Sequence, residues 1–488
     1  MPGSADVTAA DTSVAGPARH VVVVGAGITG LTAAFTLATR HPSVRVTVVE
    51  ASDRVGGKIL TTPFAGHQVD CGADAFLARV PEARELCEEL GLGAVLTSPA
   101  ERSALVWARG ELRRLPAGLV LGVPTDLDAL RASGIVSAEG VERAARDLDA
   151  TTPPASEPEG DPAGPGDMSV GQLVRGRLGD EVHERLVSPL LSGVNAGDAD
   201  HLSLAVGAAQ LASAARRRPS LIEGAREQQR QARAALADPD APVFHGIPVG
   251  TQTLTDLLLA RLVAAGGRVH LRCPVDSLEH AADGSGGYVV GTPLGPLAAD
   301  RVVLAVPGPV GARLLGQLAP DAAEGLAALD YASVAMVTLA VPRTAIGVPL
   351  DASGFLVGEA DRLPTLTACS WASTKWAHLA DPDVAILRVS AGRHGDTHAL
   401  ELDDDDLVAG VMADLGTTMG VTGEPTDRRV TRWHDALPQF RPGHLARAQG
   451  WRDEVAAVAP AWCWPAPPTT GSAFRRASVR VAGRRMRS

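Results

Sequence analysis

The chain has 488 residues, of which 45% are hydrophobic, and this length predicts two or three domains rather than one simple core. Its net charge of -11, with 56 Asp and Glu against 45 Lys and Arg, argues against nucleic acid as a partner. No apolar run reaches the roughly 18–20 residues of a membrane-spanning helix, so we expect no integral membrane segment.

The first residues and the cysteines predict the cellular compartment. Residues 1–18 lack the basic and apolar regions of a signal peptide, and we expect a disordered leader there. The five cysteines are odd in number, far apart and without a C-x-x-C pair, which favours incidental thiols over disulfides or metal ligands. We therefore expect a cytoplasmic chain without a metal site; the cysteines are Cys71, Cys87, Cys273, Cys369 and Cys463.

The ordered part opens with a strand, a helix and a second strand. Residues 21–24 are four valines, which predict a buried strand, and an Ala- and Leu-rich helix is expected from Gly25 to the break at His41-Pro42. Residues 45–50 predict the second strand. This βαβ unit predicts a parallel sheet.

The turn after the first strand carries Gly-x-Gly-x-x-Gly, which in this position is typical of a dinucleotide site. The glycines allow a tight turn and close approach of a pyrophosphate, which the helix N-terminus then faces. Glu50 follows twenty residues after Gly30 and is placed to accept hydrogen bonds from a ribose diol. The alternative is a glycine-rich turn without a ligand. The predicted contacts are Gly25, Ala26, Gly27, Ile28, Thr29, Gly30, Glu50 and Ala51.

The sequence after Glu50 selects the dinucleotide. Arg54 and the doublet Gly56-Gly57 resemble the E-x-x-x-R-x-G-G extension of the FAD-binding family that includes amine oxidases, phytoene desaturases and protoporphyrinogen oxidases. The doublet lets the backbone approach the dinucleotide, and Arg54 adds positive charge near its phosphates unless it merely pairs with a nearby acid. This resemblance favours FAD over NAD.

The resemblance continues along residues 19–460. Residues 69–92 resemble the D/E-x-G-P-D-S-F-L segment of bacterial protoporphyrinogen and coproporphyrinogen oxidases, and the chain as a whole is most similar to actinobacterial-type coproporphyrinogen III oxidases. It departs from them at Asn195, where an aromatic residue is usual, and at Ile247 and Val249, where relatives have a Gly-Gly pair.

The family resemblance implies an α/β fold with three parts. A Rossmann-like, discontinuous FAD-binding domain would comprise residues 19–100, 245–310 and 431–460. A largely helical subdomain (101–244) and a mixed α+β substrate-binding domain (311–430) would complete it. The run of Pro, Gly and acids at 151–167 predicts an exposed loop, and residues 81–150 read as helical with short breaks.

The resemblance also implies a reaction. Members of this family oxidise coproporphyrinogen III to coproporphyrin III in haem biosynthesis, removing six electrons with FAD and dioxygen and releasing hydrogen peroxide, and ferrochelatase is a possible partner. The flavin does the redox chemistry, which suits a sequence without an evident triad or metal cluster. A protoporphyrinogen IX oxidase, a flavin amine oxidase and an inactive member are the alternatives.

Site residues follow from the same resemblance. Lys58 and Asp74 would lie on the flavin side as catalytic candidates, and Arg113 and Arg114 would approach the propionates of the substrate. Val275 would place backbone groups against the adenosine end of FAD. The alternatives are a solvated Lys58, a turn-capping Asp74 and arginines without a specific role.

The tail of residues 461–488 does not continue the family pattern. It has six arginines and no acid, and the glycine-rich FAD-binding segment expected there is missing. Reading the codons one base earlier permits a segment close to the missing one, so we expect a single-base deletion near the codons of Pro460 and Ala461, with weakened flavin retention. The alternative is a natural basic tail.

Overall fold

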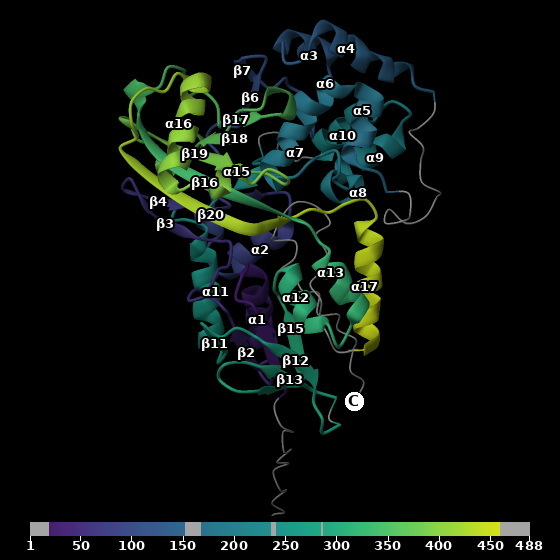
Figure 1. Cartoon of the computed structure of the whole chain (residues 1–488), viewed down its shortest axis with the longest axis vertical. Coiled ribbons are helices and arrows are strands. Elements are labelled where there is room, and N and C mark those ends of the chain that lie inside the picture. Colours follow the sequence, from purple (N-terminus) through teal and green to yellow (C-terminus); the bar gives the residue numbers. More distant parts are fainter. Residues whose placement is uncertain (1–18, 152–166, 236–240, 285, 459–488) are drawn as a thin grey trace, which may run out of the picture.

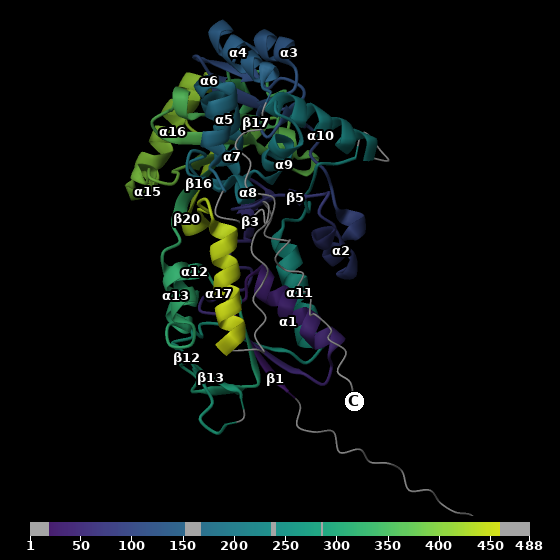
Figure 2. The ribbon, with the colours of Figure 1, turned by 90° about the vertical axis from the view of Figure 1, so that its right-hand side faces the viewer.

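The computed structural model describes residues 19–151, 167–235, 241–284 and 286–458, which form three lobes (Figure 1, Figure 2). A parallel-sheet lobe contains the first βαβ unit, a mixed-sheet lobe contains the long strands of the C-terminal half, and a helical lobe lies beside the mixed sheet. The predicted α/β class is confirmed. The predicted leader, the tail from residue 461 and most of the predicted 151–167 loop lie outside the described residues.

The parallel sheet has the strand order β11-β2-β1-β15. All five residues of β1 are buried, as expected of a β-branched strand that is covered on both faces. The turn after β1 leads into α1, which ends at Arg40, just before the predicted break. The βαβ prediction is therefore confirmed. The bounds are β1 (His20–Val24), α1 (Ile28–Arg40), β2 (Arg45–Val49), β11 (Arg268–His270) and β15 (Arg301–Leu304).

Separate hydrophobic clusters cover the two faces of this sheet. Helices α1, α2 and α11 bury their apolar side chains against one face, and a three-stranded antiparallel sheet with α12, α13 and α17 covers the other. The glycine turn lies at the carboxyl end of β1, in a sheet whose two faces are both covered. The bounds are α2 (Pro81–Glu89), α11 (Gln252–Ala264), β12 (Ser277–His280), β13 (Tyr288–Gly291), β14 (Leu297–Ala299), α12 (Gly308–Leu315), α13 (Pro320–Ala327) and α17 (His444–Val458).

The mixed sheet has the order β20-β16-β19-β18-β17-β6-β7. Helix α16 covers one face, and the β3–β4 hairpin packs with α14 in a smaller cluster. The bounds are β3 (Thr61–Phe64), β4 (His67–Asp70), β6 (Leu105–Ala108), β7 (Glu111–Arg114), β16 (Tyr331–Pro342), β17 (Gly354–Val357), β18 (Leu366–Trp371), α14 (Ala372–Lys375), β19 (Val384–Ala391), α15 (His398–Glu401), α16 (Asp404–Met419) and β20 (Asp427–Pro438).

The helical lobe packs eight helices, two of them very short, around one apolar cluster of the described residues. A π-helical segment, His183–Val187, interrupts it before α7. The bounds are β8 (Leu119–Val120), β9 (Val123–Pro124), α3 (Leu127–Ser133), α4 (Ala138–Ala145), α5 (Val170–Leu178), α6 (Asp180–Val182), α7 (Ser188–Asn195), α8 (Leu204–Gly207), α9 (Ala209–Arg217) and α10 (Leu221–Ala235).

Three boundaries drawn from the sequence differ from the structure. Residues 105–114 were expected in the helical part, but they form β6 and β7 of the mixed sheet because β6 pairs with the distant strand β17. Helix α13 and the part of α12 from residue 311 onward were expected in the substrate-binding domain, but the apolar faces of both helices pack in the parallel-sheet lobe. Strand β20 was partly assigned to the FAD-binding domain, yet its ladder partner is β16 of the mixed sheet.

Candidate functional site

The turn between β1 and α1 combines close packing with open space. An added Cβ at Gly30 would lie 1.9 Å from the carbonyl oxygen of Gly25, and Gly25 has φ +99°. At Gly27, in contrast, an added Cβ would meet nothing within 4 Å. Gly25 and Gly30 thus bring the helix against the strand, while Gly27 faces free space.

The N-terminus of α1 suits an anionic ligand. Gly27 is its N-cap residue; within the described part of the chain, no side chain caps this helix and its first turn contains no acid. The first N–H groups of a helix need acceptors, and the helix dipole favours an anion at this position. The predicted contacts Ala26, Ile28 and Thr29 surround this turn. Its residues therefore fit the pyrophosphate of a dinucleotide.

Glu50 directly follows β2, at the same carboxyl end of the parallel strands. Its carboxylate accepts hydrogen bonds from the backbone N–H of Ala26 at 2.7 Å and from the N–H and hydroxyl of Ser52 at 2.9 and 2.8 Å. A carboxylate has about four acceptor positions, so capacity remains for a ribose hydroxyl. Ala51 follows Glu50 and is exposed. Val275 is buried in the hydrophobic cluster between the parallel sheet and the three-stranded antiparallel sheet.

Arg54 organises the next loop. Its guanidinium donates to the carbonyl oxygens of Val55 and Ile59, both at 3.1 Å, and to that of Gly57. Because five N–H donors in a fixed fork hold three carbonyls of one loop, Arg54 shapes the segment that carries the glycine doublet. Its predicted contact with the cofactor phosphates stays a prediction.

The glycine doublet packs directly on the first glycine turn. Gly56 donates its N–H to the carbonyl of Ala26 at 2.9 Å, and Gly56 and Gly27 form a parallel bridge. An added Cβ at Gly57 would lie 3.2 Å from the Cα of Gly27. Both doublet residues have positive φ, which glycine adopts without strain. The structure thus brings the two predicted glycine motifs together.

Lys58 connects this loop to β20. Its ammonium donates to the carbonyl oxygen of Ala436, and its own carbonyl lies 3.0 Å from where a Cβ of Gly72 would be. The indole N–H of Trp433 donates to the carbonyl of Cys71 at 3.0 Å. The mixed sheet therefore borders the glycine motifs through β20.

Asp74 is held by three donors of the mixed-sheet lobe. Its carboxylate lies 3.0 Å from the Lys375 ammonium and 2.8 Å from the Arg388 guanidinium, and it accepts from the Trp376 indole at 3.0 Å. Burial by itself would raise the pKa of Asp74, but the charges of Lys375 and Arg388 outweigh it and keep the pKa well below its ordinary value. Asp74 therefore stays ionised at neutral pH.

Sequence reasoning did not single out Lys375 and Arg388. One compositional signal was present, because the 488 residues contain only two lysines, Lys58 and Lys375. The other basic side chains, apart from histidine, are all arginines. Each lysine is therefore a position where a compact, flexible ammonium stands in place of a planar guanidinium. Both lysines lie where the two lobes meet.

Arg113 and Arg114 lie elsewhere. They belong to β7, at the opposite edge of the mixed sheet from β20. Arg113 pairs with Glu111 at 2.8 Å, and Arg114 pairs with Asp351 at 3.0 Å. The structure therefore does not bring them to Lys58 and Asp74, and their contact with a substrate stays a prediction.

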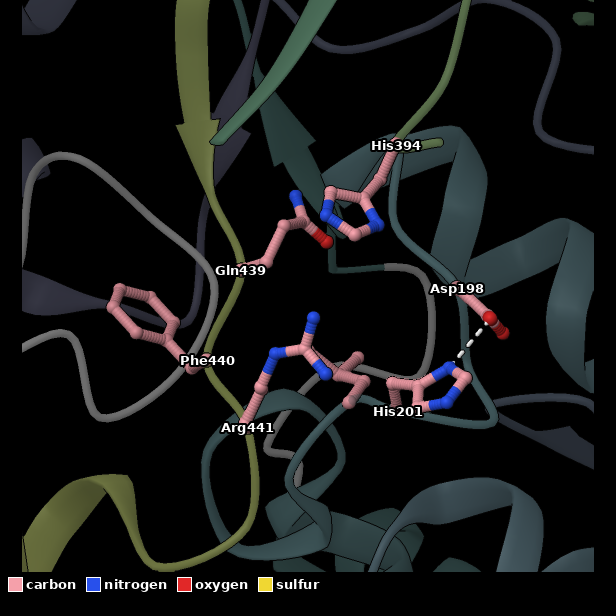
Figure 3. Close-up of a pocket in the computed structure, with 7 residues that line it drawn as sticks. Asp198, His201, His394, Gln439, Phe440 and Arg441 are labelled. Carbon is pink, nitrogen blue, oxygen red and sulfur yellow. Dashed lines mark hydrogen bonds and ion pairs between the residues drawn. The ribbon is translucent and has the colours of Figure 1, made fainter. Parts of the chain in front are cut away.

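A small hollow lies between the helical lobe and the segments that follow β19 and β20 (Figure 3). His201 faces Asp198 at 2.7 Å on the helical side, and Gln439 and Arg441 extend into it from the segment after β20. Gln439 also donates to the carbonyl oxygen of Asn195 at 3.1 Å. The hollow measures about 10 Å³, which admits about one water molecule.

Three other features of the described residues bear on chemistry. They contain no group of three or more His, Cys, Asp and Glu side chains arranged to hold a metal ion. No helix among them is long and apolar enough to cross a bilayer. The four cysteines within them are free and buried, and burial raises the pKa of the Cys87 thiol to about 11.

Comparison with known proteins agrees with this geometry. Residues 28–480 match the flavin containing amine oxidoreductase family. The chain is 33% identical to coproporphyrinogen III oxidase of Bacillus subtilis, over 94% of this chain and 95% of the relative. It is 37% identical to the enzyme of that name from Mycobacterium tuberculosis, over 87% and 88%.

Solved structures show the same relationship. A crystallised Exiguobacterium protein named for protoporphyrinogen oxidase superposes with a TM-score of 0.81 and 30% identity, over 94% of this chain and 96% of that one. Putrescine oxidase superposes with a TM-score of 0.63 at 20% identity, over 94% and 96%, which shows a shared fold.

Proposed function

The chain belongs to the flavin-containing amine oxidoreductase family, and from this we propose that it oxidises coproporphyrinogen III to coproporphyrin III with FAD in haem biosynthesis. The observation that carries the proposal is the near full-length similarity to enzymes of that name. The uncapped α1 terminus, the glycine doublet and Glu50 support the cofactor.

The proposed reaction removes six electrons and six protons from the porphyrinogen. Three dioxygen molecules take them up, and three molecules of hydrogen peroxide form. A bound flavin supplies two-electron redox chemistry to such a reaction. The protein's part is to bind and orient. The α1 terminus would hold the pyrophosphate and Glu50 would hold the ribose, while Asp74 fixes the segment that follows Gly72.

Protoporphyrinogen IX is the second candidate substrate, and the name of the Exiguobacterium structure favours it. The two porphyrinogens differ in their carboxylates: coproporphyrinogen III has four propionates, whereas protoporphyrinogen IX has two. The cations that read the additional propionates would decide between them, and Arg113 and Arg114 remain the predicted pair for this role.

The proposal extends to the cellular setting. We place the protein in the cytoplasm, supported by the described residues having no helix that could span a membrane. Ferrochelatase is the proposed recipient of the porphyrin product, because a porphyrin must receive its metal after the ring is oxidised. Co-purification from a lysate, with and without added porphyrin, tests this association.

Turnover tests the proposed function directly. The purified chain, saturated with FAD, is mixed aerobically with coproporphyrinogen III, protoporphyrinogen IX or putrescine, while porphyrin fluorescence and peroxide are followed. We expect coproporphyrin III with three peroxides for each porphyrin formed, and slower reaction with the other two. Faster peroxide formation from putrescine would contradict the proposal.

A further inference from the structure

Asp74 ties two lobes together through cations that are far away in the sequence. It lies between β4 and β5 (Phe76–Leu77), whereas Lys375 ends α14 and Arg388 belongs to β19. The three side chains are largely buried, with 18%, 19% and 5% of their surfaces exposed. Arg388 also donates to the carbonyl oxygen of Gly72, so the segment is held at two points.

Trp376 extends the same cluster toward β10 (Phe244–His245), which pairs with β5. Its indole N–H donates to Asp74 at 3.0 Å. Its ring occupies the space beside Gly246, where an added Cβ would lie 2.7 Å from it. The cluster therefore fixes both strands of the β5–β10 ladder against the mixed sheet.

The charges that touch Asp74 do not cancel, although those of its wider surroundings do. Asp70 lies near Arg388 and accepts hydrogen bonds from Thr61 and Thr251, and Arg429 packs nearby over the ring of Phe64. Burial lowers the pKa of the neighbouring His378, which leaves it neutral. Arg429 faces Asp427 as well as Asp70, so the wider surroundings contain three cations and three carboxylates. At Asp74 itself, the two cations Lys375 and Arg388 meet one carboxylate.

The cluster lies at one end of the path that the two glycine motifs define. Glu50 would hold a ribose at one end of a dinucleotide, and Gly27 faces its pyrophosphate. The path continues through Gly57, where an added Cβ would lie 3.2 Å from the Cα of Gly27, to Lys58, whose carbonyl oxygen would lie 3.0 Å from a Cβ added at Gly72. Gly72 is the residue that Arg388 holds, so the cluster adjoins the end opposite the ribose of Glu50, where the flavin ring belongs.

We propose that Asp74, Lys375 and Arg388 are positioning residues that hold the 72–75 segment beside the flavin and that their excess positive charge favours the reduced cofactor. Added electrons make the ring more negative, and nearby positive charge stabilises that form. Asp74 then acts as an anchor whose charge is already used by two cations, rather than as a proton donor. The proposal rests on the family's FAD and on no particular substrate.

The midpoint potential of the bound flavin tests this charge effect by spectroelectrochemistry, without a substrate. Lys375→Met removes a positive charge and should therefore lower the midpoint potential. At a fixed potential we expect the ratio of oxidised to reduced flavin to rise about tenfold, which corresponds to about 30 mV for a two-electron couple. Asp74→Asn removes a negative charge and should shift it in the opposite direction. Each variant breaks the same ion pair, so a merely structural role would shift both in one direction.

Two further variants complete the test. Lys375→Arg keeps the charge and should restore the wild-type potential. Arg185→Met is the matched control, because Arg185 is a partly buried cation of the helical lobe that pairs with Glu181 of α6 and with Asp361, which follows β17. The flavin potential of this variant should equal that of the wild type.

Three results would overturn the proposal. One is an unchanged potential in Lys375→Met, another is a shift of equal sign in Lys375→Met and Asp74→Asn, and the third is a chain that binds no FAD at saturating concentration. If Asp74→Asn fails to fold, the pair Lys375→Met and Lys375→Arg decides alone, since one loses the charge and the other retains it. Failure to oxidise coproporphyrinogen III would contradict the proposed function and leave this measurement intact.

Discussion

The glycine turn and the Asp74 cluster are the two parts of the proposed site, and they are built differently. The turn is local: Gly25, Gly30, Glu50 and Gly57 lie within one βαβ unit and its following loop, and the space at Gly30 and Gly57 is limited by backbone atoms of Gly25 and Gly27. The cluster is assembled from side chains 301 and more residues apart. Its geometry exists only when the parallel-sheet and mixed-sheet lobes have docked.

This difference indicates where each part tolerates change. A backbone site fails when a Cβ fills its space, whatever the chemistry of the new residue. A side-chain cluster depends instead on charge balance and on each hydrogen-bond partner. Substitutions in the glycine turn should therefore lower stability and FAD affinity. Substitutions that change a charge in the Asp74 cluster should instead change the flavin potential.

The largest effect is expected at the helix–strand contact. Gly30→Ala places a methyl group 1.9 Å from the carbonyl of Gly25, so α1 must move away from β1 at a cost of about 3 kcal/mol. Thermal unfolding and FAD fluorescence titration should show a lower midpoint and loss of tight FAD binding.

The matched control makes the same substitution in a helix that has room. At Gly176 in α5 an added Cβ meets nothing within 4 Å, so Gly176→Ala should raise stability by about 0.5–1 kcal/mol through helix propensity. Equal destabilisation by the two substitutions would contradict the packing argument for Gly30.

The second effect concerns the carboxylate of the βαβ unit. Glu50→Gln exchanges one acceptor oxygen for an NH₂ group and removes the charge that faces the Ala26 N–H and the predicted ribose. Loss of a charge-assisted hydrogen bond costs about 1.5–3 kcal/mol, so FAD should bind about 10- to 100-fold more weakly in fluorescence titration. Glu111→Gln, at the far sheet edge with Arg113, should leave FAD affinity unchanged.

The predictability of the two parts from the sequence follows the same division. The strand, the turn and Glu50 were predictable because hydrophobic period, glycine spacing and the strand end are local patterns. Lys375 and Arg388 were not, since nothing near residue 74 specifies which distant cations meet it. Asp74 itself was placed near the flavin only through family resemblance.

The differences between the predicted and the observed domain boundaries have the same origin. Strand β6 has only four residues, too few for a clear alternation of apolar and polar side chains. Its pairing with β17 joins Leu105 to Phe355, 250 residues later. Likewise, α13 and most of α12 were assigned to the substrate-binding domain through the family resemblance, yet their apolar faces pack in the parallel-sheet lobe. Strand pairing and lobe docking are long-range events that single-residue periodicity does not encode.

A smaller effect is expected when the cluster loses one neutral donor. Trp376→Phe keeps an aromatic ring beside Gly246 but removes the N–H that Asp74 accepts. Because both cations remain on Asp74, we expect a loss of about 1–2 kcal/mol in stability and an FAD affinity within about twofold of wild type. Trp451→Phe, whose ring packs on Gly325 away from the cluster, controls for ring size. A larger loss of FAD affinity than in Glu50→Gln would break the division between the two parts.

The helical lobe provides the smallest and most pH-dependent effect, outside both parts of the site. His183 in the π-helical segment is 1% exposed, and neither ring nitrogen has a hydrogen-bond partner among the described residues. Burial lowers its pKa, against the raising effect of Asp200 at 3.6 Å. As the pH falls below about 6.5, the unfolded chain takes up this proton before the folded chain does. Stability is therefore complete above this pH and is lost as the pH falls toward the folded pKa.

The expected loss is about 1.4 kcal/mol for each unit that separates the two pKa values of His183. His183→Leu removes the titration, so thermal midpoints measured from pH 8 to pH 5 should fall less steeply for this variant than for the wild type. His41→Leu replaces an exposed imidazole after α1 and should retain the wild-type slope. Because His183 lies in neither part of the proposed site, the pH dependence of FAD affinity should be the same in the wild type and in His183→Leu. A difference between the two would mean that protonation of His183 in the helical lobe affects the dinucleotide site.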